Sequence, residues 1–339
     1  MDVETRLQLV REVAEEIVTE EELRHLLETE EHPLAYDGFE PSGLAHLPFG
    51  IYRPFTLKKL LRAGFRFKLL LADWFAWINN KLGGDLERIR RAGEYFVEVW
   101  KAAGVPMDQV EILWSSDLVR DPEYWKLVLS VAKHHNLRRT LRALDIAGRE
   151  GSLENPTAWI FYPCMQVADI FYLGVQVCQL GMDQRRANML AREVAPKLGR
   201  RKPIAVHHHM LMSLRGKTPE EKMSKSKPET CIFVHDSREE IERKLRKAYC
   251  PERDPSNPVV DYVKHLVFPA FGELRLELKS GEEVSFGSFA EFEKQYVAGK
   301  IHPLDLKQGL VEYLDRLVSP IREHFKSPQG MAYLSVLEA

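Results

Sequence analysis

The stretch that decides the fold runs from residue 34 to residue 50 and reads LAYDGFEPSGLAHLPFG. Its first six residues form a short apolar run of the length of a buried strand. A loop rich in glycine and proline follows, and a helical pattern begins near residue 55. Glycine lets a backbone approach a ligand closely, and a helix start favours an anion. The segment therefore predicts a strand, a loop and a helix, with His46 placed either to donate to a phosphate or simply to complete a turn.

The same alternation continues along the chain. Apolar runs of strand length occur at residues 67–71, 110–114, 175–180 and 204–206, and helical patterns at 55–63, 85–103, 122–147 and 184–198. A further helix is expected from residue 3 to residue 17, where apolar residues fall on one face. Continuous apolar strands that alternate with helices indicate an α/β fold with a parallel sheet covered on both faces. Ligands of such sheets bind at the carboxyl ends of the strands.

The pattern changes after about residue 230. Helices predominate there, at residues 237–249, 259–266 and 303–325, with one strand pair at 273–278 and 283–286. We therefore expect two domains, an α/β domain over residues 1–230 and a mainly helical domain over residues 231–339.

Composition narrows the classes of protein. The chain has 339 residues, of which 45% are hydrophobic and 29% charged, and its formal net charge is −2, so a nucleic-acid site must be a local patch. The four cysteines form no C-x-x-C pair, which argues against structural zinc and fits a cytoplasmic protein. The apolar run at 67–77 is too short to span a bilayer, and the acidic start does not resemble a signal peptide, so we expect no membrane association.

A lysine-rich motif stands at residues 222–227 and reads KMSKSK. As charge alone it would be a solvated basic loop. As a specific string it predicts a loop that closes on a triphosphate, because lysines offset the charge that develops on leaving pyrophosphate and hydroxyls add short donors.

A polar stripe crosses an otherwise apolar helical segment at residues 157–173. Tyr162, Gln166 and Asp169 are spaced i, i+4 and i+7, so they share one face. Buried polar groups need partners. The stripe is either an internal hydrogen-bond network or the wall of a ligand pocket.

The basic clusters and a run of histidines each have a structural and a functional interpretation. Basic clusters, one of which includes Arg138, Arg139 and Arg142, are either solvated faces or RNA contacts. The run His207-His208-His209 suggests a metal, but alternate residues of a strand point to opposite faces, so we expect no metal site there.

Taken together, the motifs resemble those of class I aminoacyl-tRNA synthetases, and the chain is identified as a member of the tyrosyl-tRNA synthetases of the archaeal and eukaryotic type. The resemblance covers about residues 31–325. In the family's first signature a glycine and a second histidine follow closely; here His46 precedes Leu47-Pro48-Phe49-Gly50. The matching segments are YDGFEPSG (36–43), LLAD (70–73), YPCMQVAD (162–169), GMDQR (181–185), MLARE (189–193), AYCP (248–251) and HPLDLK (302–307).

The resemblance implies a Rossmann-like catalytic domain with a helical connective region at about 115–150, a role for each motif, and a helical anticodon-binding domain. Asp169 and Tyr36 would hold the phenol hydroxyl of tyrosine, and Tyr162, Gln166 and Gln184 its ammonium and carboxylate. His46, Lys222 and Lys225 would be catalytic. The implied ATP contacts are Gly38, His46, Gly50, Asp183, Lys222, Met223, Ser224, Lys225 and Ser226. The implied tRNA contacts are Arg138, Arg139, Arg142 and Asp305, with Phe271 or Phe286 stacking on an anticodon base.

The implied reaction activates tyrosine with ATP and Mg²⁺ to tyrosyl-adenylate and then transfers the tyrosyl group to tRNA, in a cytoplasmic homodimer. Two alternatives stay open. The chain could be a tryptophanyl enzyme on the same fold, although an indole offers only a donor to the Tyr36–Asp169 pair. It could also be a catalytically silent RNA-binding relative, which the altered stretch after His46 favours and the intact motif at 222–226 opposes.

Overall fold

The computed structural model describes residues 1–144, 154–218, 221, 223 and 227–338. The chain forms two compact units. Unit 1 comprises Met1–Ser42, Thr56–Glu94 and Pro106–His209, and unit 2 comprises Gly43–Phe55, Tyr95–Val105 and Met210–Ala339. Two short stretches from the first third of the chain thus group with the C-terminal part, so the division by contacts does not fall at residue 230. The expected domains, 1–230 and 231–339, remain a prediction about function.

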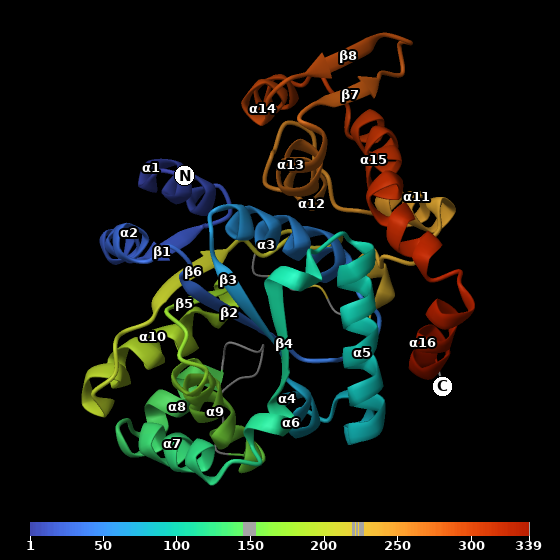
Figure 1. Ribbon diagram of the computed structural model, residues 1–339. Helices are drawn as coiled ribbons and strands as arrows, with labels where there is room; N and C mark the ends of the chain where they lie inside the picture. The colour runs from blue at the N-terminus through green and yellow to red at the C-terminus, as the bar shows by residue number, and fades with distance from the viewer. Residues whose placement is uncertain (145–153, 219–220, 222, 224–226, 339) are drawn as a thin grey trace. The chain divides into compact units, whose positions relative to one another are not determined.

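A six-stranded sheet forms the centre of unit 1, with the strand order β1-β6-β5-β2-β3-β4 (Figure 1). All neighbouring strands are parallel except β1, which pairs antiparallel with β6. The predicted parallel α/β sheet of Rossmann-like type is therefore confirmed. The strands are β1 (Glu16–Val18), β2 (Leu34–Phe39), β3 (Arg66–Leu71), β4 (Val110–Trp114), β5 (Val177–Gly181) and β6 (Ile204–His208).

β2 lies at the switch point of this sheet. It pairs with β3, the next strand along the chain, on one side and with β5 on the other. Tyr36 stands opposite Lys68 of β3 and Cys178 of β5. The connections from β2 and β5 run in opposite directions, which leaves room for a ligand at their carboxyl ends.

Helices flank the sheet on both sides, with α3 on one side and α10 on the other (Figure 1). This explains why every residue of β5 is buried and why its sequence is mostly apolar, with Gln179 as the polar exception. The helices of this part of the chain are α1 (Val3–Arg11), α2 (Glu20–Thr29), α3 (Arg53–Arg62), α4 (Asp73–Ile78), α5 (Leu86–Ala102), α6 (Ser115–Leu118), α7 (Pro122–Lys133), α8 (Leu137–Leu144), α9 (Ala158–Tyr172) and α10 (Arg185–Val194).

Two helices predicted from the sequence are wrong in extent. The helix expected at residues 122–147 is broken between α7 and α8, where His134 caps α7 and its ring Nδ1 donates to the Ser130 carbonyl. The helix expected at residues 3–17 ends at Arg11, and Ile17 belongs to β1. Ile17 pairs with Val206 at the edge of β6. Pairing with this edge favours a strand for the β-branched Ile17, although its helical spacing had predicted a place in α1.

Unit 2 is mainly helical. Its helices after residue 230 are α11 (Arg238–Arg246), α12 (Pro258–Tyr262), α13 (Phe268–Phe271), α14 (Phe289–Val297), α15 (Pro303–His324) and α16 (Pro328–Glu338). The expected strand pair is present as β7 (Leu274–Glu277) and β8 (Glu283–Phe286), and they are antiparallel. Gly281 in the turn has φ +81°, a conformation that favours glycine.

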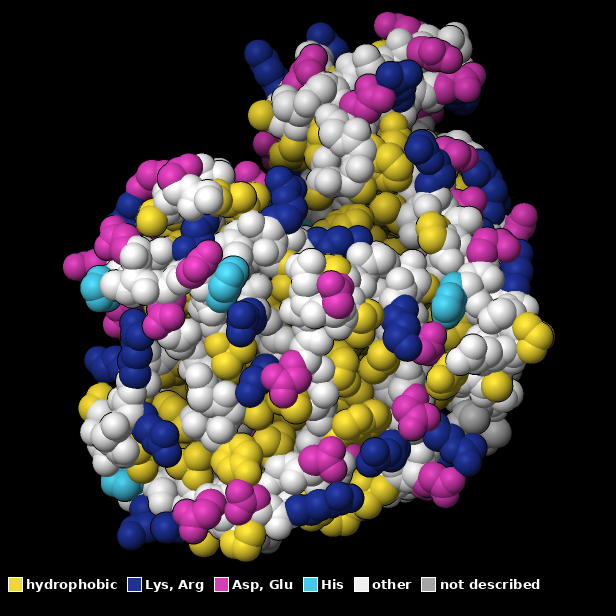
Figure 2. All heavy atoms as spheres, viewed as in Figure 1, with side chains coloured by type: hydrophobic (Ala, Val, Ile, Leu, Met, Phe, Trp, Pro, Cys, Tyr) yellow, Lys and Arg dark blue, Asp and Glu magenta, His cyan; other side chains and the backbone are white. Residues whose placement is uncertain are grey.

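Acidic and basic side chains are interspersed over the face shown in Figure 2, in keeping with the net charge of −2. None of the helices in the described part of the chain combines the length and apolar character needed to cross a bilayer.

Candidate active site

The polar stripe of α9 lies beside the carboxyl ends of β2 and β5. Asp169 is 1% exposed and Gln166 is 7% exposed, whereas Tyr162 is half-buried. Tyr162 and Gln166 are hydrogen-bonded to residues just after β2 and β5, and Asp169 lies near Tyr36 of β2. The stripe and its partners therefore form a hydrogen-bond network, called the α9 network below, and its role as the wall of a ligand pocket stays a prediction.

At the inner end of the stripe, Asp169 faces two tyrosines. The Tyr124 hydroxyl of α7 donates to Asp169 Oδ1 at 2.7 Å. Asp169 Oδ2 is buried and has no hydrogen-bond partner among the described residues. Burial raises the pKa of Asp169 to about 7, although the hydrogen bond from Tyr124 lowers it. Burial and the nearby Asp169 carboxyl raise the pKa of Tyr36 well above its ordinary value, which keeps that hydroxyl protonated.

At the outer end, amides and a carboxylate gather around the loops after β5 and β2. Gln166 Nε2 donates to Gln184 Oε1 at 2.9 Å, and Gln184 Nε2 donates to Asp183 Oδ2 at 3.0 Å. Asp183 and Gln184 belong to the short turn of helix Met182–Gln184 that follows β5. The Tyr162 hydroxyl donates to Glu40 Oε1 at 2.6 Å, one residue beyond the end of β2.

Three residues of the α9 network were missed from the sequence. Tyr124 is fully buried in the core of unit 1, and no motif marked it within the helical pattern of α7. Glu40 was quoted in a motif without a role, and Asn79, which donates to Glu40 Oε1, lies just after α4. Only the fold brings these positions together. Glu40 is 122 residues from Tyr162 and 39 from Asn79, and Tyr124 is 45 residues from Asp169.

Two glycines assigned to ATP have packing reasons of their own. A Cβ atom at Gly38 would stand 3.1 Å from the Tyr36 hydroxyl oxygen, so Gly38 makes room for that hydroxyl. A Cβ atom at Gly50 would stand 2.4 Å from a methyl group of Val234, so this glycine allows close packing within unit 2. These contacts account for glycine at both positions, and ATP contact stays a prediction.

The segment that carries His46 is held inside unit 2. His46 is half-buried and forms an antiparallel bridge with Phe233. The Leu47 amide donates to Ile232 O at 3.0 Å, and the Ala45 amide donates to the Tyr95 hydroxyl oxygen at 3.1 Å. This ties the loop to the strand-like residues that follow the lysine-rich motif. Of that motif, Met223 is half-buried, and Lys222, Ser224, Lys225 and Ser226 lie outside the described residues.

The residues expected to contact tRNA differ in availability. Arg138 and Arg142 on α8 are exposed, whereas Arg139 binds Glu193 through two hydrogen bonds of 2.8 and 2.9 Å. Asp305 is half-buried in the first turn of α15.

The two aromatic candidates differ as well. Phe286 is 6% exposed and packs on Phe292, which leaves no free ring face for a base. Phe271 is half-buried, with Arg316 over its ring at 4.7 Å and Tyr313 against its edge.

Residues of the histidine run form hydrogen bonds near the β1 edge of the sheet. His207 is fully buried, with Nδ1 at 2.9 Å from Glu16 Oε2 of β1 and Nε2 at 2.9 Å from Asn188 Nδ2 of α10. His208 instead contacts the Gln179 side chain at 3.0 Å. The two neighbouring histidines thus have different partners, as expected for successive residues of a strand.

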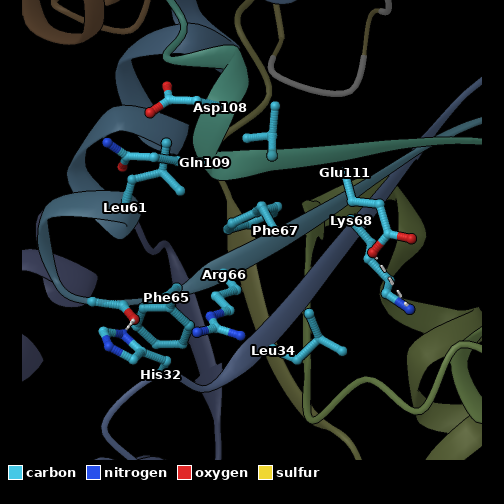
Figure 3. Close-up of a pocket in the computed structure, with 12 residues that line it drawn as sticks. His32, Leu34, Leu61, Phe65, Arg66, Phe67, Lys68, Asp108, Gln109 and Glu111 are labelled. Atoms are coloured by element: carbon cyan, nitrogen blue, oxygen red, sulfur yellow. Dashed lines mark hydrogen bonds and ion pairs between the residues drawn. The ribbon is translucent and has the colours of Figure 1, made fainter.

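A cavity of about 770 Å³ lies at the other end of the sheet, beside the amino ends of β2, β3 and β4 (Figure 3). Its polar lining is exposed or half-buried, and Lys68 pairs with Glu111 at 3.7 Å. His32 bonds the Gly64 carbonyl at 3.0 Å. Because parallel sheets bind ligands at the carboxyl ends of their strands, the candidate active site is the α9 network and not this cavity.

Comparison with known proteins decides the family. The model for class I tRNA synthetases of the tryptophan and tyrosine type matches residues 28–319. This chain belongs to that family. Two similar relatives carry the name of tyrosine–tRNA ligase. Tyrosine–tRNA ligase 1 of Arabidopsis thaliana is 45% identical over 332 residues, which cover 96% of this chain and 86% of the plant protein. A tyrosine–tRNA ligase of Saccharolobus islandicus is 43% identical over 95% of this chain and 94% of its own.

Solved structures of this synthetase family agree with the fold. The tyrosyl-tRNA synthetase of Aeropyrum pernix is 43% identical, with a TM-score of 0.92 and coverage of 100% of this chain and 99% of its own. That of Pyrococcus horikoshii, solved with L-tyrosine, is 37% identical with a TM-score of 0.92 and full coverage of both chains. A tryptophanyl-tRNA synthetase of Plasmodium falciparum is 19% identical with a TM-score of 0.72, which shows a shared fold.

Proposed function

We propose that this synthetase is a tyrosine–tRNA ligase, which activates L-tyrosine with ATP and transfers the tyrosyl group to the 3′ end of tRNA(Tyr). The observation that carries the proposal is the buried Asp169 Oδ2, which has no partner among the described residues and lies near Tyr36 at the inner end of the α9 network. A phenol donates to the carboxylate and accepts from the Tyr36 hydroxyl. Phenylalanine would leave both polar groups unpaired, so this pocket selects the hydroxyl.

The outer end of the α9 network suits the ammonium and carboxylate of the amino acid. Tyr162, Gln166 and Gln184 supply neutral hydrogen-bonding groups there, and Glu40 supplies a negative charge beside Tyr162. We assign the ammonium to the side of Tyr162 and Glu40, because a cation is stabilised by a carboxylate. The amide groups of Gln166 and Gln184 then orient the rest of the backbone of the substrate.

ATP enters as the magnesium complex, with the metal carried on the phosphates. The tyrosine carboxylate attacks the α-phosphorus, the bond to the bridging oxygen breaks, and pyrophosphate leaves. His46, Lys222 and Lys225 stabilise the charge on the phosphates, Met223, Ser224 and Ser226 complete the lysine-rich loop, and Asp183 binds the ribose hydroxyls. No protein nucleophile is needed, because catalysis rests on positioning and on charge stabilisation.

The second step transfers the tyrosyl group from the adenylate to a hydroxyl of the terminal adenosine of tRNA. Exposed Arg138 and Arg142 are the arginines free to bind phosphates, and Asp305 is proposed to bond an anticodon base. We propose a homodimer located in the cytoplasm, in keeping with the plant relative, whose name includes that compartment.

The test is amino-acid-dependent exchange of labelled pyrophosphate into ATP, measured with each of the twenty amino acids. We expect exchange with tyrosine, and charging of tRNA(Tyr) when tRNA is added. Exchange with tryptophan alone would replace the proposal with the tryptophanyl alternative. No exchange with any amino acid would leave an RNA-binding relative without catalysis.

A further inference from the structure

The Tyr124 hydroxyl occupies one side of the carboxyl group that the phenol of the substrate must use. It donates to Asp169 Oδ1 at 2.7 Å, and its oxygen also lies 3.4 Å from the Met165 carbonyl, which is on the same face of α9. Tyr124 is 0% exposed, so this hydrogen bond is shielded from water. The partner of the bond is a carboxyl group, and hydrogen bonds to charged groups are roughly twice as strong as neutral ones.

The other oxygen of Asp169 is left open by this arrangement. Oδ2 is buried and has no partner among the described residues. A carboxyl group with one oxygen held and the other open presents a single, fixed acceptor. Without a donor at Oδ1, the two oxygens become equivalent, and the group can rotate about its Cβ–Cγ bond, which is a soft torsion. The acceptor would then have no preferred direction.

Tyr124 is itself fixed by packing. It belongs to the core cluster of unit 1, its ring meets the edge of Trp125 at 5.9 Å, and the ring of Tyr172 packs against it at 5.5 Å. α7 and α9 pack closely along their lengths. The donor therefore has a defined position before any substrate binds, which is the condition for preorganised recognition.

We propose that Tyr124 is a positioning residue for the selection of tyrosine: it holds Asp169 through Oδ1 and so directs Oδ2 at the phenol hydroxyl of the substrate. The proposal rests on the proposed function, because it concerns the same pocket. Tyr124 acts through Asp169 and does not itself touch the substrate.

The test is a cycle that combines two forms of the protein with two substrates. Tyr124→Phe removes only the hydroxyl. For the unaltered protein and for this variant, kcat/KM of pyrophosphate exchange is measured with tyrosine and with phenylalanine. We expect the ratio of the two constants to fall by about tenfold in the variant, mainly through KM for tyrosine, with KM for ATP unchanged. A loss of general packing would lower both constants alike and leave the ratio as it was.

A matched control is available on the same helix pair. The Tyr172 hydroxyl donates to Asp121 Oδ2 at 2.6 Å, and both residues are exposed or nearly so. Tyr172→Phe therefore removes a tyrosine–aspartate bond of similar length that does not involve Asp169. We expect the tyrosine-to-phenylalanine ratio of this variant to equal that of the unaltered protein. An equal fall in both variants would overturn the proposal.

A second pair of variants keeps the test decisive if Tyr124→Phe folds poorly with an unpartnered charge beside it. Asp169→Ala is compared with the double variant Asp169→Ala/Tyr124→Phe. If Tyr124 acts only through the carboxyl group, the two have the same ratio. A further drop in the double variant would show that Tyr124 acts by another route.

The outcomes separate this inference from the proposed function. If the unaltered protein does not activate tyrosine, the proposed function fails and this inference fails with it. If it activates tyrosine and the ratio is the same in Tyr124→Phe, the proposed function stands and the inference is wrong.

Discussion

A single carboxyl group shows how function acts against stability at the scale of the residue. Asp169 is fully buried, one of its oxygens has no partner among the described residues, and its pKa is raised to about 7 by burial. Near neutral pH the folded protein must therefore hold a charge that its interior disfavours. The hydroxyl of a tyrosine substrate would supply the missing donor, so binding would stabilise the buried charge of Asp169.

We predict that Asp169→Asn stabilises the free protein while it impairs tyrosine activation. Asparagine keeps an acceptor for the Tyr124 hydroxyl and removes the buried charge, so we expect a gain of about 1–3 kcal/mol in the free energy of unfolding near pH 8. The phenol of the substrate loses its charged acceptor, and kcat/KM for tyrosine should fall by about 100-fold. Urea titration of both proteins checks the first effect and pyrophosphate exchange the second.

The pH dependence of this gain has a definite sign. The pKa of Asp169 is about 7 in the folded protein and near its ordinary value of 3.8 in the unfolded chain. Between these values the folded state binds more protons, so the stability of the unaltered protein falls as pH rises from about 4 to about 7. The gain from Asp169→Asn should thus be largest above pH 7 and vanish near pH 4. A gain that is equal at pH 4 and pH 8 would contradict the assignment.

At the scale of the element, one buried arginine joins three helices of unit 1. Arg6 of α1 is 7% exposed, and its guanidinium donates to four backbone carbonyls. Three of these acceptors belong to Leu27, Glu30 and Glu31 at the end of α2, and the fourth is the Ala63 carbonyl directly after α3. The last carbonyls of a helix have no partner within it and carry the negative end of the helix dipole.

We predict that Arg6→Met lowers the free energy of unfolding by about 2–4 kcal/mol, because buried carbonyls lose their donor. Arg24 of α2, which forms a surface ion pair with Glu4, is the matched control, and Arg24→Ala should cost far less than Arg6→Met. Urea denaturation compares the two. Equal losses would show that the buried bonds add nothing beyond an exposed ion pair, and KM for tyrosine should stay unchanged in both variants.

At the scale of the whole molecule, we propose that the two steps of the reaction depend on different parts of the chain. Asp305 stands in the first turn of α15, far along the chain from the residues proposed to bind tyrosine and ATP. We predict that Asp305→Ala lowers kcat/KM of tRNA charging by about tenfold, the cost of one lost base contact, and leaves pyrophosphate exchange unchanged.

The control for this prediction is a tRNA whose anticodon is altered at the contacted base. If Asp305 bonds that base, the two losses are not additive, because each removes the same contact. Additive losses, or an effect on pyrophosphate exchange, would show that Asp305 does not read the anticodon.

The sequence by itself determined the fold class and the family, and it predicted that three polar residues of α9 share one face. Continuous apolar strands predicted the parallel sheet, because only a sheet buried on both faces needs them. Helical spacing alone placed Tyr162, Gln166 and Asp169 on one face, since that face is a property of local geometry. The capping box of Thr19 and Glu22 at the start of α2 is present for the same reason.

Tertiary structure decided what depends on partners distant in sequence. Tyr124 and Glu40 belong to the candidate site only because the fold packs α7 and the end of β2 against α9. No local sequence pattern marks either residue. Ile17 lies in a strand and not in the predicted helix, because it pairs with the edge of β6. Gly50 and Val234, which share a tight contact, are 184 residues apart in the chain numbering, and close packing of this kind becomes visible only in the folded molecule. Local preferences weigh about 1 kcal/mol or less per residue, so burial and pairing with distant segments override them.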